Sequence, residues 1–316
     1  MCWAINSFDK RGGSVYLRRL VDWRRSKGTK DLIIERCHKT SYLIWGLKIV
    51  WTAWLSSGEV RGTAPLVIPF ALIVPKARLY VQSPVLKWSL LSRVLFRIAV
   101  ARRGISAVCV SEYIAETIKS YGAESAKICY AKISDELQQW SEPEGSGHVW
   151  IALMDGGILE KGYLNHLAVL TSLRDLDLNI CIYAEVKDDE DLRRYDGLGS
   201  VRFCGKVQRP FEHFNEIKQG AKGFYLGMSS YEGLHMAIVE AGLTNLPTLM
   251  SDIPAHRELE RISGTRLEIF GTTYKAAERL REAVDDTEVY RVMAGGSRVL
   301  GKKFQEVSLG GEFIRT

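Results

Sequence analysis

Short apolar runs alternate with longer amphipathic stretches along most of this chain, and that alternation constrains the fold more than any other feature. The runs with the character of β-strands occupy residues 3–6, 31–35, 78–82, 105–110 and 149–153. The stretches 14–27 and 87–103 instead have the apolar spacing of amphipathic helices. Parallel sheets produce this pattern because a crossover helix must join each strand to the next. We therefore predict an α/β fold.

A hydrophilic segment at residues 134–147 divides the chain. It contains Pro143, Gly145 and Gly147, and a new strand-like run follows it directly. A chain of 316 residues is long enough for two modest hydrophobic cores. We predict two Rossmann-like domains, residues 1–140 and residues 141–316, with the last helix a candidate to cross back to the first domain.

The densest group of functional signals lies between residues 229 and 258. Glu232 precedes Gly233, whose backbone is free to form a tight turn, and an apolar run from Leu234 to Ala241 reads as the start of a buried helix. Glu240 would lie about 80° around a continuous helix from Glu232, so we expect one carboxylate in the loop and one in the helix. A helix start binds phosphate through its free amides, and carboxylates accept hydrogen bonds from hydroxyls. The pattern predicts a site for a phosphorylated, hydroxyl-rich ligand.

Residues 229–241 have the frame S-x-x-E-G-x-x-M-x-x-x-E-A, and S-D-x-P-x-H-R-E follows at 251–258. This arrangement resembles the donor site of family-4 retaining glycosyltransferases, which have the GT-B fold of two Rossmann-like domains facing across a cleft. Residues 201–207 are similar to the F-x-G-x-V segment of that family, and residues 160–162 to its K-G segment. The resemblance covers most of the chain and is dense from about residue 150 to residue 260.

The resemblance assigns roles to individual residues. Glu232 would hold the donor sugar, Lys161 would pair with the donor diphosphate, and Glu240 would hold the ribose hydroxyls. The leaving phosphate would take the proton of the acceptor, and the anomeric configuration would be retained. The remaining donor-binding residues that it implies are Gly12, Gly13, Lys206, Val207, Gly233, Leu234, His235 and Met236.

The chain departs from the family pattern at two positions. Gly156 stands where an arginine usually precedes Lys161 by five residues, so Lys206 or Arg209 would have to supply that cation. Residues 80–84 lack the histidine that many relatives carry in the first domain, and Gln82 is no effective general base. These departures motivate an alternative hypothesis, a nucleotide-sugar-binding protein without transferase activity.

Charge is distributed unevenly between the two predicted domains. Residues 1–140 contain 22 Lys or Arg and 10 Asp or Glu, whereas the remainder contains 21 and 27. Six of the eight tryptophans also lie in the first hundred residues, and Leu91, Val94, Leu95 and Ile98 form an apolar stripe among arginines. The stripe could pack on the sheet and leave the arginines solvated. Otherwise the basic half could meet an anionic membrane with a lipid-linked acceptor, or nucleic acid.

We therefore predict a retaining glycosyltransferase that moves a sugar from a nucleotide-sugar donor to a lipid-linked or cell-envelope saccharide. A glycosyltransferase acting on a modified base in viral DNA is the alternative with the same donor. No histidine or cysteine spacing indicates a metal site, so neither metal nor cofactor is expected. The cysteines are expected to be reduced, with Cys109, Cys129, Cys181 and Cys204 in buried strands. Without a signal peptide or an apolar span, we expect a cytoplasmic protein, peripheral at the inner face of the membrane if the acceptor is lipid-linked.

Overall fold

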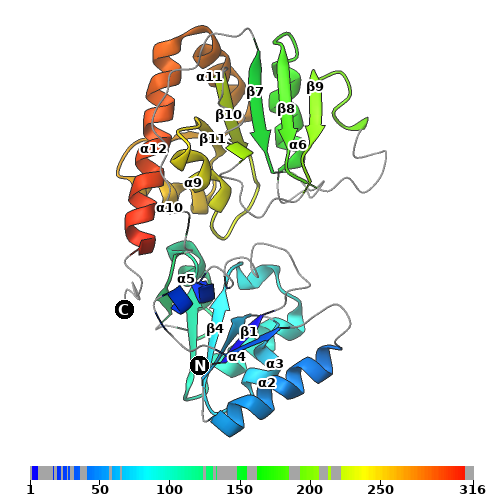
Figure 1. The fold of residues 1–316 in the computed structure, drawn as a ribbon, viewed down its shortest axis with the longest axis vertical. Coiled ribbons are helices and arrows are strands. Elements are labelled where there is room, and N and C mark those ends of the chain that lie inside the picture. Colours follow the sequence, from blue (N-terminus) through cyan, green and yellow to red (C-terminus); the bar gives the residue numbers. More distant parts are fainter. Residues whose placement is uncertain are drawn as a thin grey trace. The chain divides into compact units, whose positions relative to one another are not determined.

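The chain forms two compact units, each described by itself. The first comprises Met1–Lys132 with Val307–Thr316, and the second comprises Ile133–Glu306 (Figure 1). The predicted boundary after residue 140 falls outside the described residues. The computed structural model describes residues 2–5, 17, 20–22, 24–26, 28, 32–35, 41–56, 59–64, 66–123, 126–130, 133, 148–154, 162–184, 193–205, 213–214 and 222–309.

The first unit is built on a parallel sheet of six strands in the order β2-β1-β3-β4-β5-β6. The strand-like runs predicted in this half are confirmed as β1, β2, β4 and β5. Its strands are β1 Cys2–Ile5, β2 Leu32–Glu35, β3 Val60–Thr63, β4 Ala77–Val81, β5 Ile105–Cys109 and β6 Lys127–Ile128.

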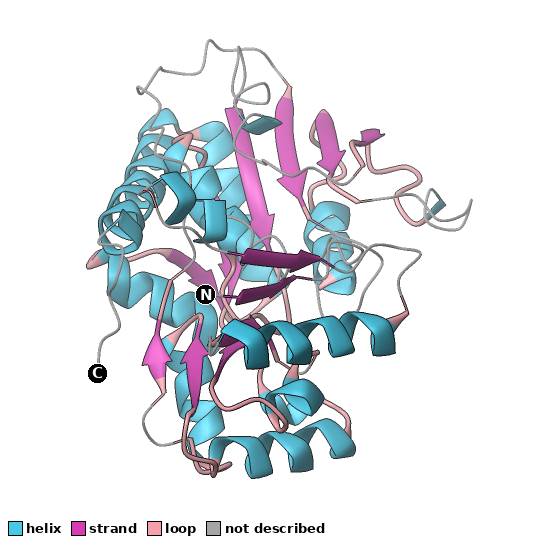
Figure 2. Cartoon of the chain, turned by 60° about the horizontal axis from the view of Figure 1, so that its bottom comes forward, coloured by secondary structure: helices cyan, strands magenta, loops and turns pink. Residues whose placement is uncertain are grey.

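Helices alternate with these strands (Figure 2). α2 packs against β1 and β2, α4 packs against β5, and α3 contacts both α2 and α4. The predicted helix at 87–103 is shorter than expected, because Ser89 caps the first turn of α4 by accepting a hydrogen bond from Ser92 N at 3.2 Å. The elements are α2 Tyr42–Ser56, α3 Ile68–Ala71, the 3₁₀ turn η1 Val85–Lys87, α4 Leu90–Val100 and α5 Glu112–Lys119.

The second unit is also built on a parallel six-stranded sheet, in the order β12-β11-β10-β7-β8-β9. Its strands are β7 Val149–Leu153, β8 Leu178–Ile182, β9 Ser200–Phe203, β10 Lys222–Gly227, β11 Thr248–Ser251 and β12 Glu268–Phe270. Its helices are α6 Tyr163–Ser172, α9 Met236–Leu243, α10 Pro254–Ser263, α11 Thr273–Asp285 and α12 Thr287–Leu309, whose last residues belong to the first unit.

The order of the second sheet locates its binding edge. The sheet has two halves, β7-β8-β9 and β10-β11-β12, and β7 and β10 are neighbours at its centre. This is the strand order of a Rossmann fold. Ligands of such sheets bind outside the carboxyl ends of the strands where the order reverses, here after β7 and β10. The prediction of two Rossmann-like α/β domains is confirmed.

Glycines allow α9 and α12 to cross at very short range. A Cβ on Gly301 would lie 2.7 Å from the backbone nitrogen of Leu243, and a Cβ on Gly242 would collide with the carbonyl of Ser297. The hydroxyl of Ser297 also forms a hydrogen bond with the hydroxyl of Thr248 in β11, with 3.0 Å between the two oxygens. The long helix α12 therefore holds α9 in place against the sheet.

The cysteines are placed partly as predicted. Cys109 and Cys181 are buried in β5 and β8, whereas Cys129 and Cys204 are half-buried just after β6 and β9. The expectation that all four lie in buried strands was therefore wrong for the last two. All four thiols are free. Among the helices of the described residues, none combines the length and the hydropathy that crossing a membrane requires.

Candidate functional site

At the binding edge of the second sheet, hydrogen bonds join α6 to the residue that follows β10. Asn165 donates from Nδ2 to the carbonyl of Met228 at 3.0 Å, and His166 Nε2 accepts from the Met228 amide at 3.2 Å. Gly162, at the N-cap of α6, has a left-handed backbone (φ 76°), and a Cβ there would overlap the Met228 carbonyl. Both the left-handed backbone and the close approach of the Met228 carbonyl require glycine at this position. The start of α6 therefore lies directly beside the loop after β10.

The two predicted carboxylates belong to this region. Glu232 lies in the loop between β10 and α9 and is 8% exposed, and Glu240 lies within α9 and is 3% exposed. Burial raises the pKa of Tyr225 well above its usual value, and the charges of Glu232 and Glu240 raise it further. Both carboxylates therefore act electrostatically on the same phenol, which belongs to β10. The expected division into one loop carboxylate and one helix carboxylate is what the structure shows.

The start of α9 carries backbone amides, of which that of Met236 donates to the Leu234 carbonyl at 3.1 Å. The helix begins at Met236, two residues later than the apolar run suggested, and His235 at its N-cap makes no side-chain capping hydrogen bond. Its first turn is built from Met236, Ala237 and Ile238, and such a turn carries amides without partners inside the helix and partial positive charge. Gly227 allows this helix to approach β10, because a Cβ there would lie 2.7 Å from Ile238 Cδ1.

A continuous series of hydrogen bonds runs from Glu232 through the base of the site. Ser229 donates from Oγ to Glu232 Oε1 at 3.0 Å, and the Ser229 carbonyl accepts from the hydroxyl of Ser251. His256 Nδ1 lies 2.7 Å from the Ser251 carbonyl, and its Nε2 lies 2.9 Å from His235 Nδ1. The loop that carries Glu232 is therefore tied to β11 and α10.

The carbonyl oxygen at one end determines the direction of this series. The Ser251 carbonyl can only accept, so His256 donates from Nδ1. If both imidazoles are neutral, His256 Nε2 then accepts from His235 Nδ1, and His235 Nε2 accepts from the hydroxyl of Tyr225 at 3.1 Å. One proton arrangement satisfies every member of the series, which holds the N-cap residue of α9 in a single orientation.

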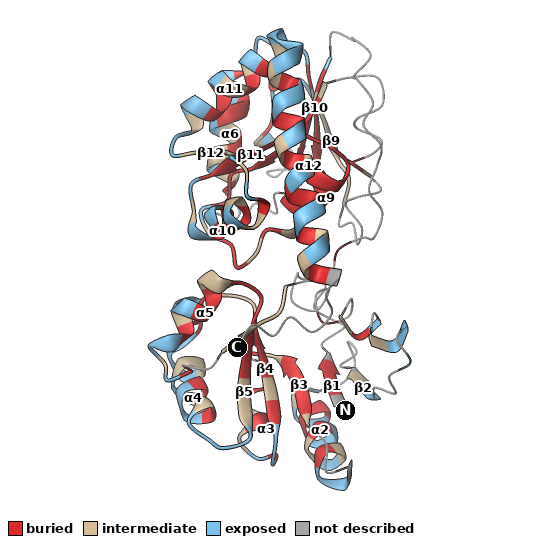
Figure 3. Cartoon of the chain, turned by 90° about the vertical axis from the view of Figure 1, so that its left-hand side faces the viewer, coloured by how far each residue is buried: buried red, intermediate tan, exposed pale blue. Residues whose placement is uncertain are grey.

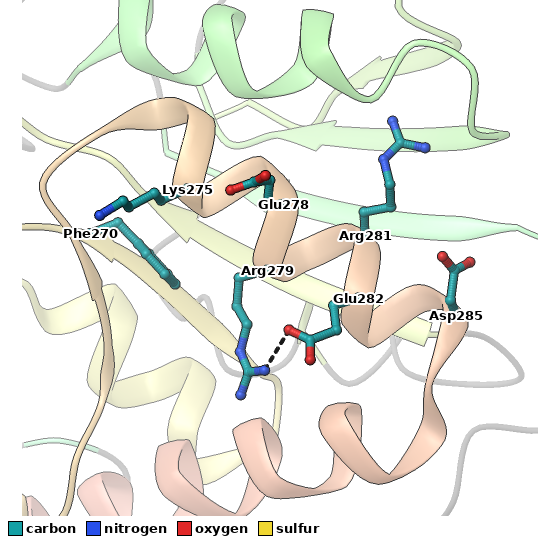
Figure 4. Close-up of a pocket in the computed structure, with 7 residues that line it drawn as sticks. All are labelled: Phe270, Lys275, Glu278, Arg279, Arg281, Glu282 and Asp285. Carbon is teal, nitrogen blue, oxygen red and sulfur yellow. Dashed lines mark hydrogen bonds and ion pairs between the residues drawn. The ribbon is translucent and has the colours of Figure 1, made fainter.

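A hollow of about 630 Å³ lies along α11, away from the residues described above (Figure 4). Arg279 is bonded there to Glu268 and Glu282. Arg281 makes two hydrogen bonds of 2.7 Å to Asp175, which lower the pKa of that carboxyl to about 2. Both guanidinium groups are paired with carboxylates, so this hollow is a weaker candidate for an anionic ligand than the start of α9. Its lining residues are Phe270, Lys275, Glu278, Arg279, Arg281, Glu282 and Asp285.

Some residues of the predicted site lie together in the structure, and the others lie outside the described residues. Glu232, Gly233, Leu234, His235, Met236 and Glu240 all lie between β10 and the end of α9. Gly12, Gly13, Lys161, Lys206 and Val207, as well as Arg209, lie outside the described residues. His256 holds the loop after β11 through its contact with the Ser251 carbonyl. Sequence reasoning missed Tyr225, Asn165 and His166, which no motif marks, and it gave no role to Ser251, although this residue begins the motif at 251–258.

Comparisons with known proteins give a fold and no close relative. No protein-family profile matches the chain, and no curated protein matches it. Among solved structures, the Anabaena protein HepE in complex with UDP and glucose superposes with a TM-score of 0.73 at 14% identity, over 98% of this chain and 97% of that one. The chain has the GT-B fold.

Two further structures agree with that assignment. WaaG, a glycosyltransferase involved in lipopolysaccharide biosynthesis, superposes with a TM-score of 0.71 at 13% identity, covering 99% of both chains. A glycosyltransferase from Rickettsia africae gives a TM-score of 0.71 at 12% identity, over 98% of this chain and 95% of that one. The match spans the whole chain in each case, so both units take part in the similarity.

Proposed function

We propose that this chain is a retaining glycosyltransferase of family 4 that uses a nucleotide-sugar donor. The observation that carries the proposal is the pair of buried carboxylates, Glu232 and Glu240, beside the start of α9 at the point where the strand order of the sheet reverses. Two structures with the same fold, WaaG and the Rickettsia africae protein, are glycosyltransferases, and a third, HepE, is in complex with UDP and glucose.

The roles follow from the chemistry of each group. The amides at the start of α9 bind the diphosphate and stabilise the charge that it gains as the sugar departs. Glu240 accepts hydrogen bonds from the ribose hydroxyls, and Glu232 accepts them from hydroxyls of the sugar. Lys161 adds a cation to the diphosphate. The leaving phosphate oxygen takes the proton of the attacking acceptor hydroxyl on the same face of the sugar, which retains the anomeric configuration.

We propose a lipid-linked or cell-envelope saccharide as the acceptor. The support is the basic, tryptophan-rich first unit together with the fold shared with WaaG, a glycosyltransferase involved in lipopolysaccharide biosynthesis. A saccharide carried on a lipid would be presented at a membrane surface, where a cationic domain is attracted to anionic headgroups. The protein would then work as a peripheral enzyme at the cytoplasmic face.

The test begins with thermal unfolding of the protein in a panel of nucleotide sugars, with UDP-glucose first. A donor at one hundred times its dissociation constant stabilises the folded state by about 2.7 kcal/mol. Glu232→Gln and Glu240→Gln should lose most of that shift, whereas Glu278→Gln, an exposed carboxylate on α11, should keep it.

Turnover separates an enzyme from a binding protein. With the stabilising donor and a lipid-linked saccharide fraction, NMR of the product should show the same anomeric configuration as the donor. An inverted product would refute the retaining mechanism. Binding of a donor without any consumption of it would favour the nucleotide-sugar-binding protein, and transfer to hydroxymethylated DNA would favour the alternative acceptor.

A further inference from the structure

Helix α2 is apolar on both of its faces. Trp45, Ile49 and Ala53 are at most 1% exposed and face the sheet. On the opposite side six large apolar side chains are exposed, within an arc of about 120° at 100° per residue. They are Leu43, Ile44, Leu47, Trp51, Trp54 and Leu55, with exposures from 52% to 71%. A helix that is apolar all round is normally buried on all sides, so a further surface is expected to cover this one.

Helix α4 repeats the arrangement. Phe96 and Ala99 are its buried residues. Its exposed apolar residues lie on the opposite side, and Leu86 of η1 is exposed beside them. The predicted stripe on this helix therefore does not pack on the sheet, since Leu91, Val94 and Ile98 are 69%, 48% and 51% exposed and Leu95 is half-buried. Figure 3 shows exposed residues along both α2 and α4.

These side chains form one surface. α3 contacts both α2 and α4, so the three helices belong to one layer on the sheet. Ile73, just after α3, is 56% exposed as well. Among the described residues, 12 of the 17 large apolar side chains that are exposed lie between residues 43 and 98. Monomeric proteins rarely expose apolar groups in such a concentration, and it typically marks a binding surface.

The charge around this surface has one sign. Residues 36–111 contain eleven Lys or Arg and a single acidic residue, Glu59. Glu59 is itself paired with Arg61 and Arg78, at 2.7 Å and 3.2 Å. Lys48, Lys87 and Arg97 are exposed on the same helices as the apolar residues. The surface is thus apolar and cationic, with its carboxylate neutralised.

This combination favours a lipid bilayer over the other partners. Nucleic acid would use the cations and leave the tryptophans and leucines in contact with phosphates and water. An anionic bilayer accommodates both, because apolar side chains enter the acyl boundary while Lys and Arg meet the headgroups. Tryptophan is enriched at that depth of a membrane.

We propose that the α2–α4 surface, formed by the exposed residues of α2, η1 and α4, docks in the plane of an anionic bilayer. The 15 residues of α2 extend about 22 Å, which is too short to span the hydrocarbon core and suits a helix lying flat. A shallow hollow of about 580 Å³ along it, lined by Ile44, Leu47, Lys48, Val50, Trp51 and Trp54, gives the acyl chains an apolar seat. The proposal holds whether or not the chain transfers sugar.

The test is flotation of the full chain with vesicles of phosphatidylcholine, alone or mixed with anionic phosphatidylglycerol. The unchanged protein should float with the anionic vesicles. Trp51→Ser combined with Trp54→Ser should weaken that binding by roughly tenfold or more, since two large apolar groups no longer enter the bilayer. Both side chains are more than half exposed, so circular dichroism should show an intact fold.

Two further variants sharpen the test. Val292→Ser removes a 58% exposed apolar residue from α12 of the second unit and should bind vesicles like the unchanged protein. Lys87→Gln with Arg97→Gln should reduce binding to anionic vesicles on the order of tenfold and leave binding to phosphatidylcholine unchanged.

Three results would overturn the proposal. The first is no flotation with anionic vesicles, or flotation that the double tryptophan variant does not weaken. The second is a gel shift with duplex DNA that the Lys87 and Arg97 variant abolishes while vesicles are not bound. The third is a dimer in sedimentation velocity that the tryptophan variant dissociates, again without vesicle binding, which would make the surface an interface between two copies.

Discussion

Because α9 and α12 cross at very short range, we expect alanine at a glycine of this crossing to destabilise the protein. Gly301→Ala would place a methyl group 2.7 Å from Leu243 N and 2.8 Å from the carbonyl carbon of Gly242. Non-bonded carbon atoms settle at about 3.5–4.0 Å, so one helix must shift by nearly 1 Å. The atoms in the way belong to the backbone, which no rotamer change can move aside.

The magnitude follows from two opposed terms. Overpacking a filled core typically costs about 1–3 kcal/mol, and alanine in place of glycine in a helix returns up to about 1 kcal/mol. We therefore expect Gly301→Ala to lower the free energy of unfolding by about 1–2 kcal/mol. Gly295→Ala is the matched control in the same helix, because a Cβ there meets nothing within 4 Å. It should raise the free energy of unfolding by roughly 0.5–1 kcal/mol.

The assay is calorimetric unfolding of the two variants beside the unchanged protein. For a domain of this size 1 kcal/mol corresponds to about 2–4 °C in Tm, so Gly301→Ala should melt roughly 2–8 °C lower and Gly295→Ala slightly higher. Gly301→Ala should also weaken donor binding, since α9 carries Glu240. Equal increases in Tm for both variants would refute the close crossing.

Other predictions concern protons and buried contacts. Burial raises the pKa of the Tyr80 phenol to about 12 and also raises that of Tyr290. The folded state therefore keeps these protons above pH 10 while the unfolded chain releases them, so stability should hold below about pH 10 and fall toward pH 12; absorbance titration with and without urea checks it. Burial also raises the thiol pKa of Cys109 to about 12 and that of Cys181 to about 11, so iodoacetamide at mildly alkaline pH should label both only in urea, as peptide mass mapping would show. His256→Leu should lower the unfolding free energy by about 1–3 kcal/mol and weaken donor binding, and His256→Gln should restore part of both.

The backbone pattern of the fold was predictable because strands and helices bury residues with different periods. The run 149–153 and the glycine turn before Glu240 are strong local signals, and β7 and α9 lie where those signals place them. α2 was missed because Trp45 lies on one side of it and Leu43 and Trp54 lie on the other, and an evenly apolar segment has no amphipathic period. Spacing alone also could not decide which side of α4 is buried, because the stripe is apolar and so are Phe96 and Ala99 on the other side.

The side-chain network of the site was beyond sequence reasoning for a different reason. His235 and His256 are 21 residues apart, and they meet because β10 and β11 are neighbours whose following helices start at the same edge of the sheet. The contact of Asn165 with Met228 spans 63 residues and depends on β7 pairing with β10. Such pairs follow from strand order, which the sequence pattern indicates only as a class of fold.

We propose above that Glu240 recognises the ribose of a nucleotide-sugar donor. Calorimetric titration should compare the nucleoside diphosphate of the stabilising donor with its 2′,3′-dideoxy analogue, in the unchanged protein and in Glu240→Ala. Hydrogen bonds to a charged group contribute about 1.5–3 kcal/mol, so the unchanged protein should bind the analogue roughly 10–100-fold more weakly, and the variant should bind both ligands alike. A variant that still discriminates as strongly as the unchanged protein would contradict the assignment.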